Sequence, residues 1–278
     1  MRTISCEQIT AEIKKIILSA GVCLDPDCID VMKKALPHET GAAAFALDVT
    51  LKNAEIAQKN NDPVCQDTGM AVVFIEAGQD VHFTDGILTD AINEGVREAY
   101  LEGFFRKSVL DPITRKNTLD NTPAIIHYSI VPGDKVKIDV MLKGFGSENM
   151  SRLFMLPPSA GIEGIKDSVI KSVAEAGGNP CPPVVVGVGI GGTMEKAAIM
   201  SKHALLRSVK SNNPDKYLDE LEKELTDKIN ALNIGPQGFG GKLTCLKVLI
   251  EKYPTHLAGL PVAVTMQCHA VRHGSIIL

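Results

Sequence analysis

The first sixty residues carry apolar side chains at the spacing of amphipathic helices. Ser5, with Gln8 three residues later, is typical of a helix N-terminus, while Pro37 and Pro63 mark places where a helix must end. Apolar side chains recur every three to four positions between these marks. The pattern predicts helices over residues 5–20, 26–36 and 39–59.

Beyond residue 63 the apolar positions change to short runs and to the alternation that is typical of strands. Pro132-Gly133-Asp134 joins two alternating segments, which predicts an antiparallel hairpin. Further helices are expected over 87–105, 162–176, 194–207 and 215–232. Strands are expected over 71–77, 125–130, 135–142, 184–190, 246–250, 262–267 and 275–278.

This order predicts a mixed α/β (α+β) fold in which a helical start precedes mixed parallel and antiparallel sheets flanked by helices. No repeat, low-complexity segment or clear linker interrupts the chain. We therefore expect one domain over residues 1–278. It could form two lobes, a helical start over 1–62 and an α/β remainder over 63–278.

The charge and hydropathy of the chain argue against binding to nucleic acid, secretion and membrane insertion. The net charge is −4, tryptophan is absent, and no basic stripe with interleaved aromatic residues occurs, so nucleic acid is not an expected partner. The N-terminus lacks the apolar core of a secretion signal, and no apolar run is long enough to cross a bilayer. A soluble, cytoplasmic protein is expected.

Seven cysteines without a signal peptide favour free thiols or metal ligands over a disulfide framework. Cys65, Cys181 and Cys268 stand beside glycine, proline or the end of an apolar strand, where a bulky inorganic group has room. The other four lie in or beside helical or apolar segments and are expected to be small buried hydrophobic residues. The spacing of the three matches neither zinc fingers nor ferredoxins, so spacing alone indicates a metal only weakly.

A glycine-rich run, Gly187 to Gly192, formally satisfies the dinucleotide-binding pattern G-x-G-x-x-G. Two helices are expected after it, with no second strand that ends in an acidic residue for a ribose. We therefore exclude a nicotinamide site and predict a close-packing turn.

Four motifs together carry a resemblance to a known family, and they occur in the same order as in that family. The chain resembles, over nearly all of its length, the alpha subunit of class I fumarate hydratases and of the related L-tartrate dehydratases. The motifs are C-Q-D-T-G at 65–69, G-G-N-P-C-P-P at 177–183, G-I-G-G-T at 189–193 and G-F-G-G-K at 238–242.

The resemblance implies a 4Fe-4S cluster held by the thiolates of Cys65, Cys181 and Cys268. The fourth iron would have no protein ligand and could bind a substrate carboxylate and hydroxyl as a Lewis acid. The implied enzyme is a hydro-lyase that interconverts fumarate and malate, small dicarboxylates.

The resemblance also implies roles for residues around the first cysteine. Asp67 is expected to be a general acid or base, although aspartate before Thr-Gly can also simply cap a turn. Gln66 and Arg106 are expected to bind substrate carboxylates, although Arg106 could also be a solvated helix-end arginine. Backbone N–H groups near Gly144 and Gly146 are expected beside the substrate. Weaker candidates are Lys242, His269, Arg272 and His273.

The length of the chain, compared with the family that it resembles, indicates a separate partner subunit. Single-chain members of the family continue into a second catalytic domain, whereas this sequence stops ten residues after Cys268. We therefore expect a separate beta subunit that supplies the catalytic base, a hetero-oligomer such as α2β2, and little activity of the chain alone.

Three alternatives remain at this stage. L-tartrate is the other substrate that the resemblance allows, although Ser147–Asn149 and Gly191–Thr193 look more like the fumarase branch. An iron-sulfur protein for electron transfer or iron sensing belongs to a second class, but an electron carrier would favour four thiolates. A zinc-bound or metal-free interaction protein is the third.

Overall fold

The computed structural model describes residues 2–278 and divides the chain into two compact units. Unit 1 contains residues up to Asp25, residues 53–145 and residues 272–278, and unit 2 contains residues 26–52 and 146–271. The three helices expected in the first sixty residues are present, and they are divided between the units. Helix α1 (Cys6–Val22) lies in unit 1, α2 (Pro26–Ala35) lies in unit 2, and α3 (Gly41–Asn60) begins in unit 2 and ends in unit 1.

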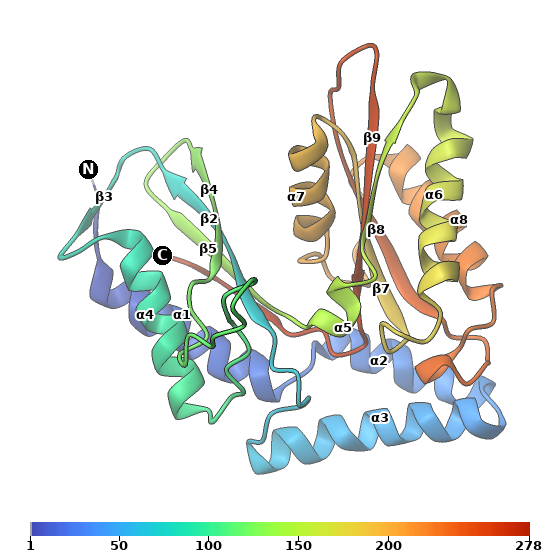
Figure 1. The fold of residues 1–278 in the computed structure, drawn as a ribbon, viewed down its shortest axis with the longest axis horizontal. Helices are drawn as coiled ribbons and strands as arrows, with labels where there is room; N and C mark the ends of the chain where they lie inside the picture. Colours follow the sequence, from blue (N-terminus) through green and yellow to red (C-terminus); the bar gives the residue numbers. More distant parts are fainter. Residues whose placement is uncertain (1) are drawn as a thin grey trace. The chain divides into compact units, whose positions relative to one another are not determined.

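Unit 1 is a four-stranded sheet with two helices on one face (Figure 1). The strand order is β10-β5-β2-β4, and helices α1 and α4 (Leu88–Glu102) pack against the sheet and each other. A separate parallel pair joins β1 and β3. The strand bounds are β1 Arg2–Ser5, β2 Met70–Gly78, β3 Val81–Thr84, β4 Ile125–Val131, β5 Val136–Lys143 and β10 His273–Ile277.

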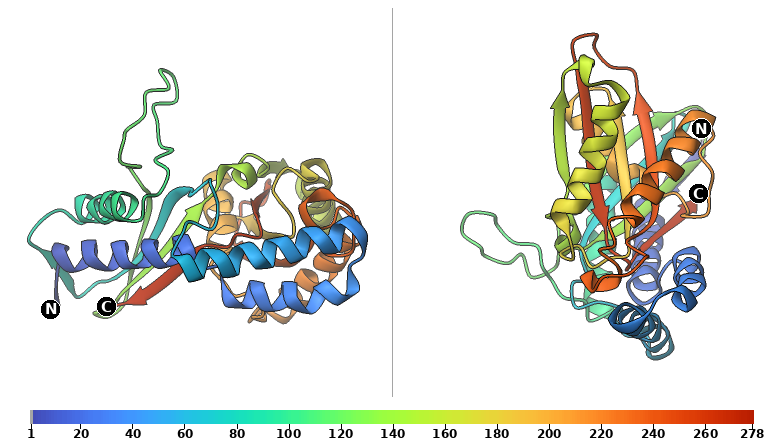
Figure 2. Two further views of the ribbon diagram at one scale, coloured as in Figure 1. Left: turned by 90° about the horizontal axis from the view of Figure 1, so that it is seen from below. Right: turned by 90° about the vertical axis from the view of Figure 1, so that its right-hand side faces the viewer.

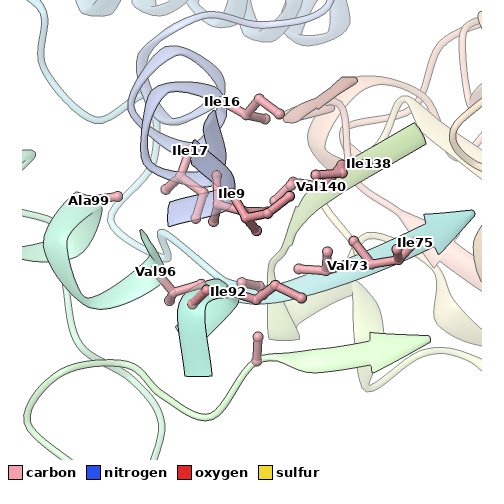
Figure 3. Packing of buried hydrophobic residues seen from close by; sticks show 14 of the residues in the cluster. Ile9, Ile16, Ile17, Val73, Ile75, Ile92, Val96, Ala99, Ile138 and Val140 are labelled. Carbon is pink, nitrogen blue, oxygen red and sulfur yellow. The ribbon is translucent and has the colours of Figure 1, made fainter. Parts of the chain in front are cut away.

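The core of unit 1 follows from the helical spacing of isoleucines in α1. Ile9, Ile13 and Ile17 are fully buried and belong to one apolar cluster with Val73 of β2 and Val140 of β5. Figure 3 shows Ile9 and Ile17 of this cluster with the two valines. Each such side chain contributes about 1.5–3 kcal/mol to folding relative to an exposed position. The predicted helix start is confirmed, because the Ser5 hydroxyl accepts a hydrogen bond from the Gln8 N–H at 3.2 Å.

The predicted hairpin of residues 125–130 and 135–142 is wrong, because β2 lies between these two strands. β4 pairs with β2 in parallel, and β5 pairs with the other edge of β2 in antiparallel orientation. β2 is almost entirely buried, whereas Tyr128 and Ile130 of β4 are exposed. The more apolar strand therefore takes the centre of the sheet, and β4 takes an edge.

Unit 2 contains a four-stranded sheet in the order β6-β9-β7-β8, with helices on both faces (Figure 1). Helices α6 and α8 pack on one face, and α7 packs on the other. Strand β6 and the short helix α5 fall in segments for which loops or no element were expected. The bounds are α5 Phe145–Glu148, β6 Arg152–Leu156, α6 Gly161–Ala176, β7 Val184–Gly191, α7 Met194–Ala204, α8 Lys216–Asn230, β8 Cys245–Tyr253 and β9 Leu260–Gln267.

The glycine-rich run begins within strand β7, and its first glycines allow α7 to approach the sheet. A Cβ atom on Gly187 would lie 1.9 Å from the Ser201 carbonyl oxygen, and one on Gly189 would lie 2.1 Å from the Ala197 carbonyl oxygen. Close packing is thus confirmed as the role of these glycines, but in a strand rather than in a turn. The mixed α/β class is confirmed as well.

Among residues 2–278, no helix combines the length and the apolar character that crossing a bilayer requires.

Candidate functional site

Two backbone N–H groups of unit 1 hold the Asp67 carboxylate, one inside the Cys65–Gly69 turn and one outside it. The Gly69 N–H donates to Asp67 Oδ1 at 3.0 Å, and the Phe145 N–H donates to Asp67 Oδ2 at 2.7 Å. The first bond is the turn-capping bond that the sequence suggested as an alternative role. The second joins the turn to a segment 78 residues away. Such charge-assisted bonds hold the carboxylate in one orientation.

Two buried polar side chains support the same turn from behind. The Tyr100 hydroxyl lies 3.0 Å from the Thr68 carbonyl oxygen and 2.8 Å from that of Gly69. Asn121 is fully buried and donates from its amide to the Gly69 carbonyl at 3.2 Å. Burial raises the pKa of Tyr100 far above its ordinary value, so its hydroxyl remains a donor at neutral pH. Neither residue was predicted from the sequence.

Gly69 itself is required by the turn. Its φ is +84°, and a Cβ atom there would lie 2.9 Å from backbone atoms of Leu142 and Lys143. Real Cβ atoms do not approach backbone this closely, and L side chains also disfavour this φ.

We expect Gly69→Ala to lower the free energy of unfolding by about 3 kcal/mol, because backbone strain and overlap with β5 add together. Gly240→Ala is the matched control. Gly240 has a φ of +80° but nothing within 4 Å of its Cβ position, so that variant should lose only about 1 kcal/mol. Urea unfolding of the two variants measures the difference. Equal losses of unfolding free energy in the two variants would show that the close approach of β5 to Gly69 does not matter for stability.

The other predicted site residues of unit 1 lie around this turn. The Arg106 carbonyl accepts from the Thr68 hydroxyl at 2.8 Å, and the Arg106 side chain is exposed. Gln66 is exposed as well. A Cβ atom on Gly144 would lie 3.1 Å from Asp67 Oδ2, so the Gly144 backbone lies directly against the carboxylate. These positions bring Arg106 and Gly144 to the Asp67 turn.

Cys181 and Cys268 are brought together within unit 2. Cys181 follows a proline, is exposed and has a φ of +55°, which is rare outside glycine and asparagine. Its carbonyl oxygen lies 2.9 Å from Nδ1 of His269, the residue that follows Cys268. The half-buried Cys268 sulfur lies 3.7 Å from the amide nitrogen of Gln267. Gly146 belongs to the same unit, and a Cβ atom on it would lie 3.9 Å from the Asn179 carbonyl oxygen.

Gln237 connects the two cysteine segments. Its backbone N–H donates to the Pro182 carbonyl at 2.8 Å, and its side-chain amide nitrogen lies 3.1 Å from the same oxygen. The same amide nitrogen also lies 3.1 Å from Nδ1 of His269. Gln237 precedes the G-F-G-G-K motif and was not predicted as a site residue.

A buried carboxylate holds the end of that motif. Glu39 is 7% exposed and accepts from the Lys242 and Leu243 N–H groups at 2.6–3.0 Å. A Cβ atom on Gly241 would lie 2.5 Å from the Glu39 carboxylate, so the glycine makes room for it. In the described contacts, Lys242 therefore binds Glu39 through its backbone N–H.

Three of the other four cysteines differ chemically from these three, whereas Cys23 is half-buried rather than buried as expected. Cys6, Cys28 and Cys245 are buried, and burial raises the pKa of the Cys6 thiol and raises that of Cys245 to about 12. Such thiols stay protonated and suit the packing role expected for them.

Cys65, Cys181 and Cys268 are exposed or half-buried, and soft thiol donors of this kind fit an iron-sulfur cluster. Cys65 belongs to unit 1, and the other two belong to unit 2. In the part of the chain that the structure describes, no three His, Cys, Asp or Glu side chains are grouped as a metal site.

Comparison with known proteins adds information about the whole chain. The profile of the family described as fumarate hydratase (Fumerase) matches residues 10–277. A protein of Methanocaldococcus jannaschii, provisionally named L(+)-tartrate dehydratase subunit alpha, is 40% identical over 272 residues, which are 95% of each chain. The L(+)-tartrate dehydratase subunit alpha of Escherichia coli O157:H7 is 34% identical over 257 residues, 91% of this chain and 84% of its own.

Proposed function

This chain belongs to the fumarate hydratase (Fumerase) family of iron-sulfur hydro-lyases, and we propose that it is the alpha subunit of an enzyme that interconverts fumarate and malate. The observation that carries the proposal is the Asp67 carboxylate, which two backbone N–H groups fix in a turn two residues after Cys65. A hydratase needs an oriented acid or base beside its Lewis acid. In this turn Asp67 is the proposed acid or base, and Cys65 is a proposed ligand of the Lewis-acidic cluster.

The proposed cofactor is a 4Fe-4S cluster with Cys65, Cys181 and Cys268 as its ligands. Support comes from the exposed or half-buried state of these thiols and from the raised pKa values of Cys6 and Cys245. When bound, such a cluster supplies an iron without a protein ligand, which polarises the substrate hydroxyl and carboxylate.

The chain's own residues have distinct proposed tasks. Asp67 exchanges a proton with the leaving hydroxyl, and its two backbone donors keep its orientation through the reaction. Arg106 and Gln66, exposed beside the turn, bind a substrate carboxylate. Backbone N–H groups near Gly144 and Gly146 bind further carboxylate oxygens.

A separate beta subunit is the proposed partner. The relatives named above are called subunit alpha, which supports a second chain that completes the enzyme. We propose that residues 1–278 act together as one functional alpha domain, in a hetero-oligomer such as α2β2 in the cytoplasm. The catalytic base and further carboxylate-binding groups would then belong to the partner.

L(+)-tartrate is the second candidate substrate, because the relatives reported above carry that name. Malate and L-tartrate are both dicarboxylates with a hydroxyl on the carbon next to a carboxylate, so the proposed dehydration chemistry is the same.

The test is anaerobic reconstitution with the beta subunit, followed by assays of malate and L-tartrate dehydration. Turnover of malate supports the proposal. Turnover of tartrate alone would make L-tartrate, rather than malate, the substrate of the enzyme. An assembled enzyme with an intact cluster that dehydrates neither would overturn the hydro-lyase assignment for this chain.

Gln237→Leu is expected to weaken cluster retention about 10–100-fold, because the amide that joins Pro182 to His269 is lost. The rate of iron release to a chelator measures the effect. Gln79→Leu, at an exposed position of unit 1, is the control and should release iron at the wild-type rate. If both variants behave alike, Gln237 does not position the cysteine segments.

A further inference from the structure

Arg272 is a buried cation directly before β10. It follows Cys268 by four residues, and its carbonyl accepts from the Leu142 N–H at 2.9 Å. Its side chain is among the largest fully buried ones, with the residue only 2% exposed. Because a guanidinium does not lose its proton in proteins, this charge is permanent.

The guanidinium reaches the Asp67 turn within unit 1. Its Nη1 donates to the Asp67 carbonyl oxygen at 2.7 Å, and a Cβ atom on Gly144 would lie 3.3 Å from its Nη2. One terminal nitrogen of the guanidinium therefore contacts the Asp67 peptide, and the other lies close to the glycine beside the Asp67 carboxylate.

The contacts of Arg272 leave its charge without an ion pair. Among residues 2–278 no carboxylate forms a salt bridge with it, and its buried Nε has no hydrogen-bond partner. The Asp67 carboxylate is nearby, but both of its oxygens accept backbone N–H bonds. Burying a cation in this way is costly unless an anion is present in the working protein.

Two further groups lie close to this charge. Arg272 lowers and Asp67 raises the pKa of the Tyr100 hydroxyl, against the larger upward effect of burial, so all three share one small region. Lys143 is a second buried cation there, and its ammonium donates to the Gly144 carbonyl at 3.0 Å.

We propose that Arg272 is a positioning residue and the buried counter-cation of the cluster site. One nitrogen holds the Asp67 carbonyl, and with it the turn that begins at Cys65. The charge stabilises the Cys65 thiolate and a bound dicarboxylate, both anionic, because a nearby cation favours charged partners. This inference rests on the proposed cluster and deepens it, since it names the residue that compensates the negative charge.

Two substitutions separate the charge from the hydrogen bond. Arg272→Gln can keep a donor toward the Asp67 carbonyl but removes the charge, whereas Arg272→Lys keeps the charge and removes the planar fork. Arg152→Gln is the control, because Arg152 is exposed and donates to the carbonyls of Asn149 and Ser151. Each variant is assembled anaerobically with the beta subunit and compared with the wild type.

The readouts are iron bound per alpha chain, the rate of iron release to a chelator, and the electron paramagnetic resonance signal after mild oxidation. We expect Arg272→Gln to release iron about 10–100-fold faster than the wild type, Arg272→Lys to lie between them, and Arg152→Gln to match the wild type. Thermal unfolding of the cluster-free chains reports any loss of fold separately.

Equal iron release by Arg272→Gln and the wild type would overturn the inference. So would equal rates for the glutamine and lysine variants with equal loss of thermal stability, since that result assigns Arg272 a structural role alone. A wild-type chain that binds no iron would instead overturn the proposed cluster, so the two failures are distinguishable.

Discussion

Cys181→Ser is expected to lose its cluster and at least about 10³-fold of the hydro-lyase activity. A serine hydroxyl does not ionise at neutral pH, and its hard oxygen is a poor ligand for an iron-sulfur cluster. Loss of the proposed cluster would remove several kcal/mol of Lewis-acid stabilisation of the transition state, which corresponds to a loss of this size. The side chain is exposed, so the fold should tolerate the change.

Iron and sulfide analysis after anaerobic reconstitution measures this prediction, together with malate dehydration in the presence of the beta subunit. Cys23→Ser is the control, because Cys23 is a half-buried cysteine at the end of α1. It should retain iron, sulfide and activity. Full iron content in the Cys181→Ser protein would contradict the ligand assignment.

Asp67→Asn is expected to lower kcat about 10²–10⁴-fold while the cluster is retained. The amide cannot transfer a proton as a carboxylate does, and proton transfer by a positioned group contributes about this much. The amide also offers one acceptor oxygen where the carboxylate offers two, so either the Gly69 or the Phe145 N–H loses its partner. A loss of about 1–3 kcal/mol in the free energy of unfolding should follow.

Steady-state kinetics and the visible spectrum of the assembled enzyme measure this prediction together. Asp111→Asn is a suitable control, because Asp111 accepts similar backbone bonds from Ile113 and Thr114 in an exposed loop, which projects from unit 1 in Figure 2. It should keep wild-type kcat. A wild-type kcat in Asp67→Asn would show that the carboxylate only caps its turn.

The helices of this chain could be predicted because their signals are local. Ile9, Ile13 and Ile17 show the helical period directly, and Ser5 caps the helix that they form. Strand pairing depends on contacts between distant segments. The turn at Gly133 indicated a hairpin, but β2 is the strand that fits between β4 and β5.

Short elements also escaped prediction. All five residues of β6 are exposed or half-buried, so the strand has no alternation of buried and exposed positions. Helix α5 has only four residues, fewer than a sequence period needs.

The candidate site was visible in the sequence only where a motif marks it. Asp67 stands in such a motif, whereas Tyr100 and Asn121 reach the turn from 31 and 52 residues away. Arg272 was only a weaker candidate, and its contact with the turn spans 205 residues. Gln237 and Glu39 likewise act on distant backbone groups. An arginine or a glutamine carries no signal of such a contact, since the contact exists only after folding.

The most direct test of the central claim is Mössbauer spectroscopy of the chain reconstituted with isotopically enriched iron and assembled with the beta subunit. The spectrum should show about four irons per alpha chain in a single cluster. Addition of malate should change the signal of one iron and leave the others unaltered, because in the proposed cluster one iron alone has no protein ligand. A cluster whose irons all keep their signals in the presence of malate and of tartrate would contradict the account.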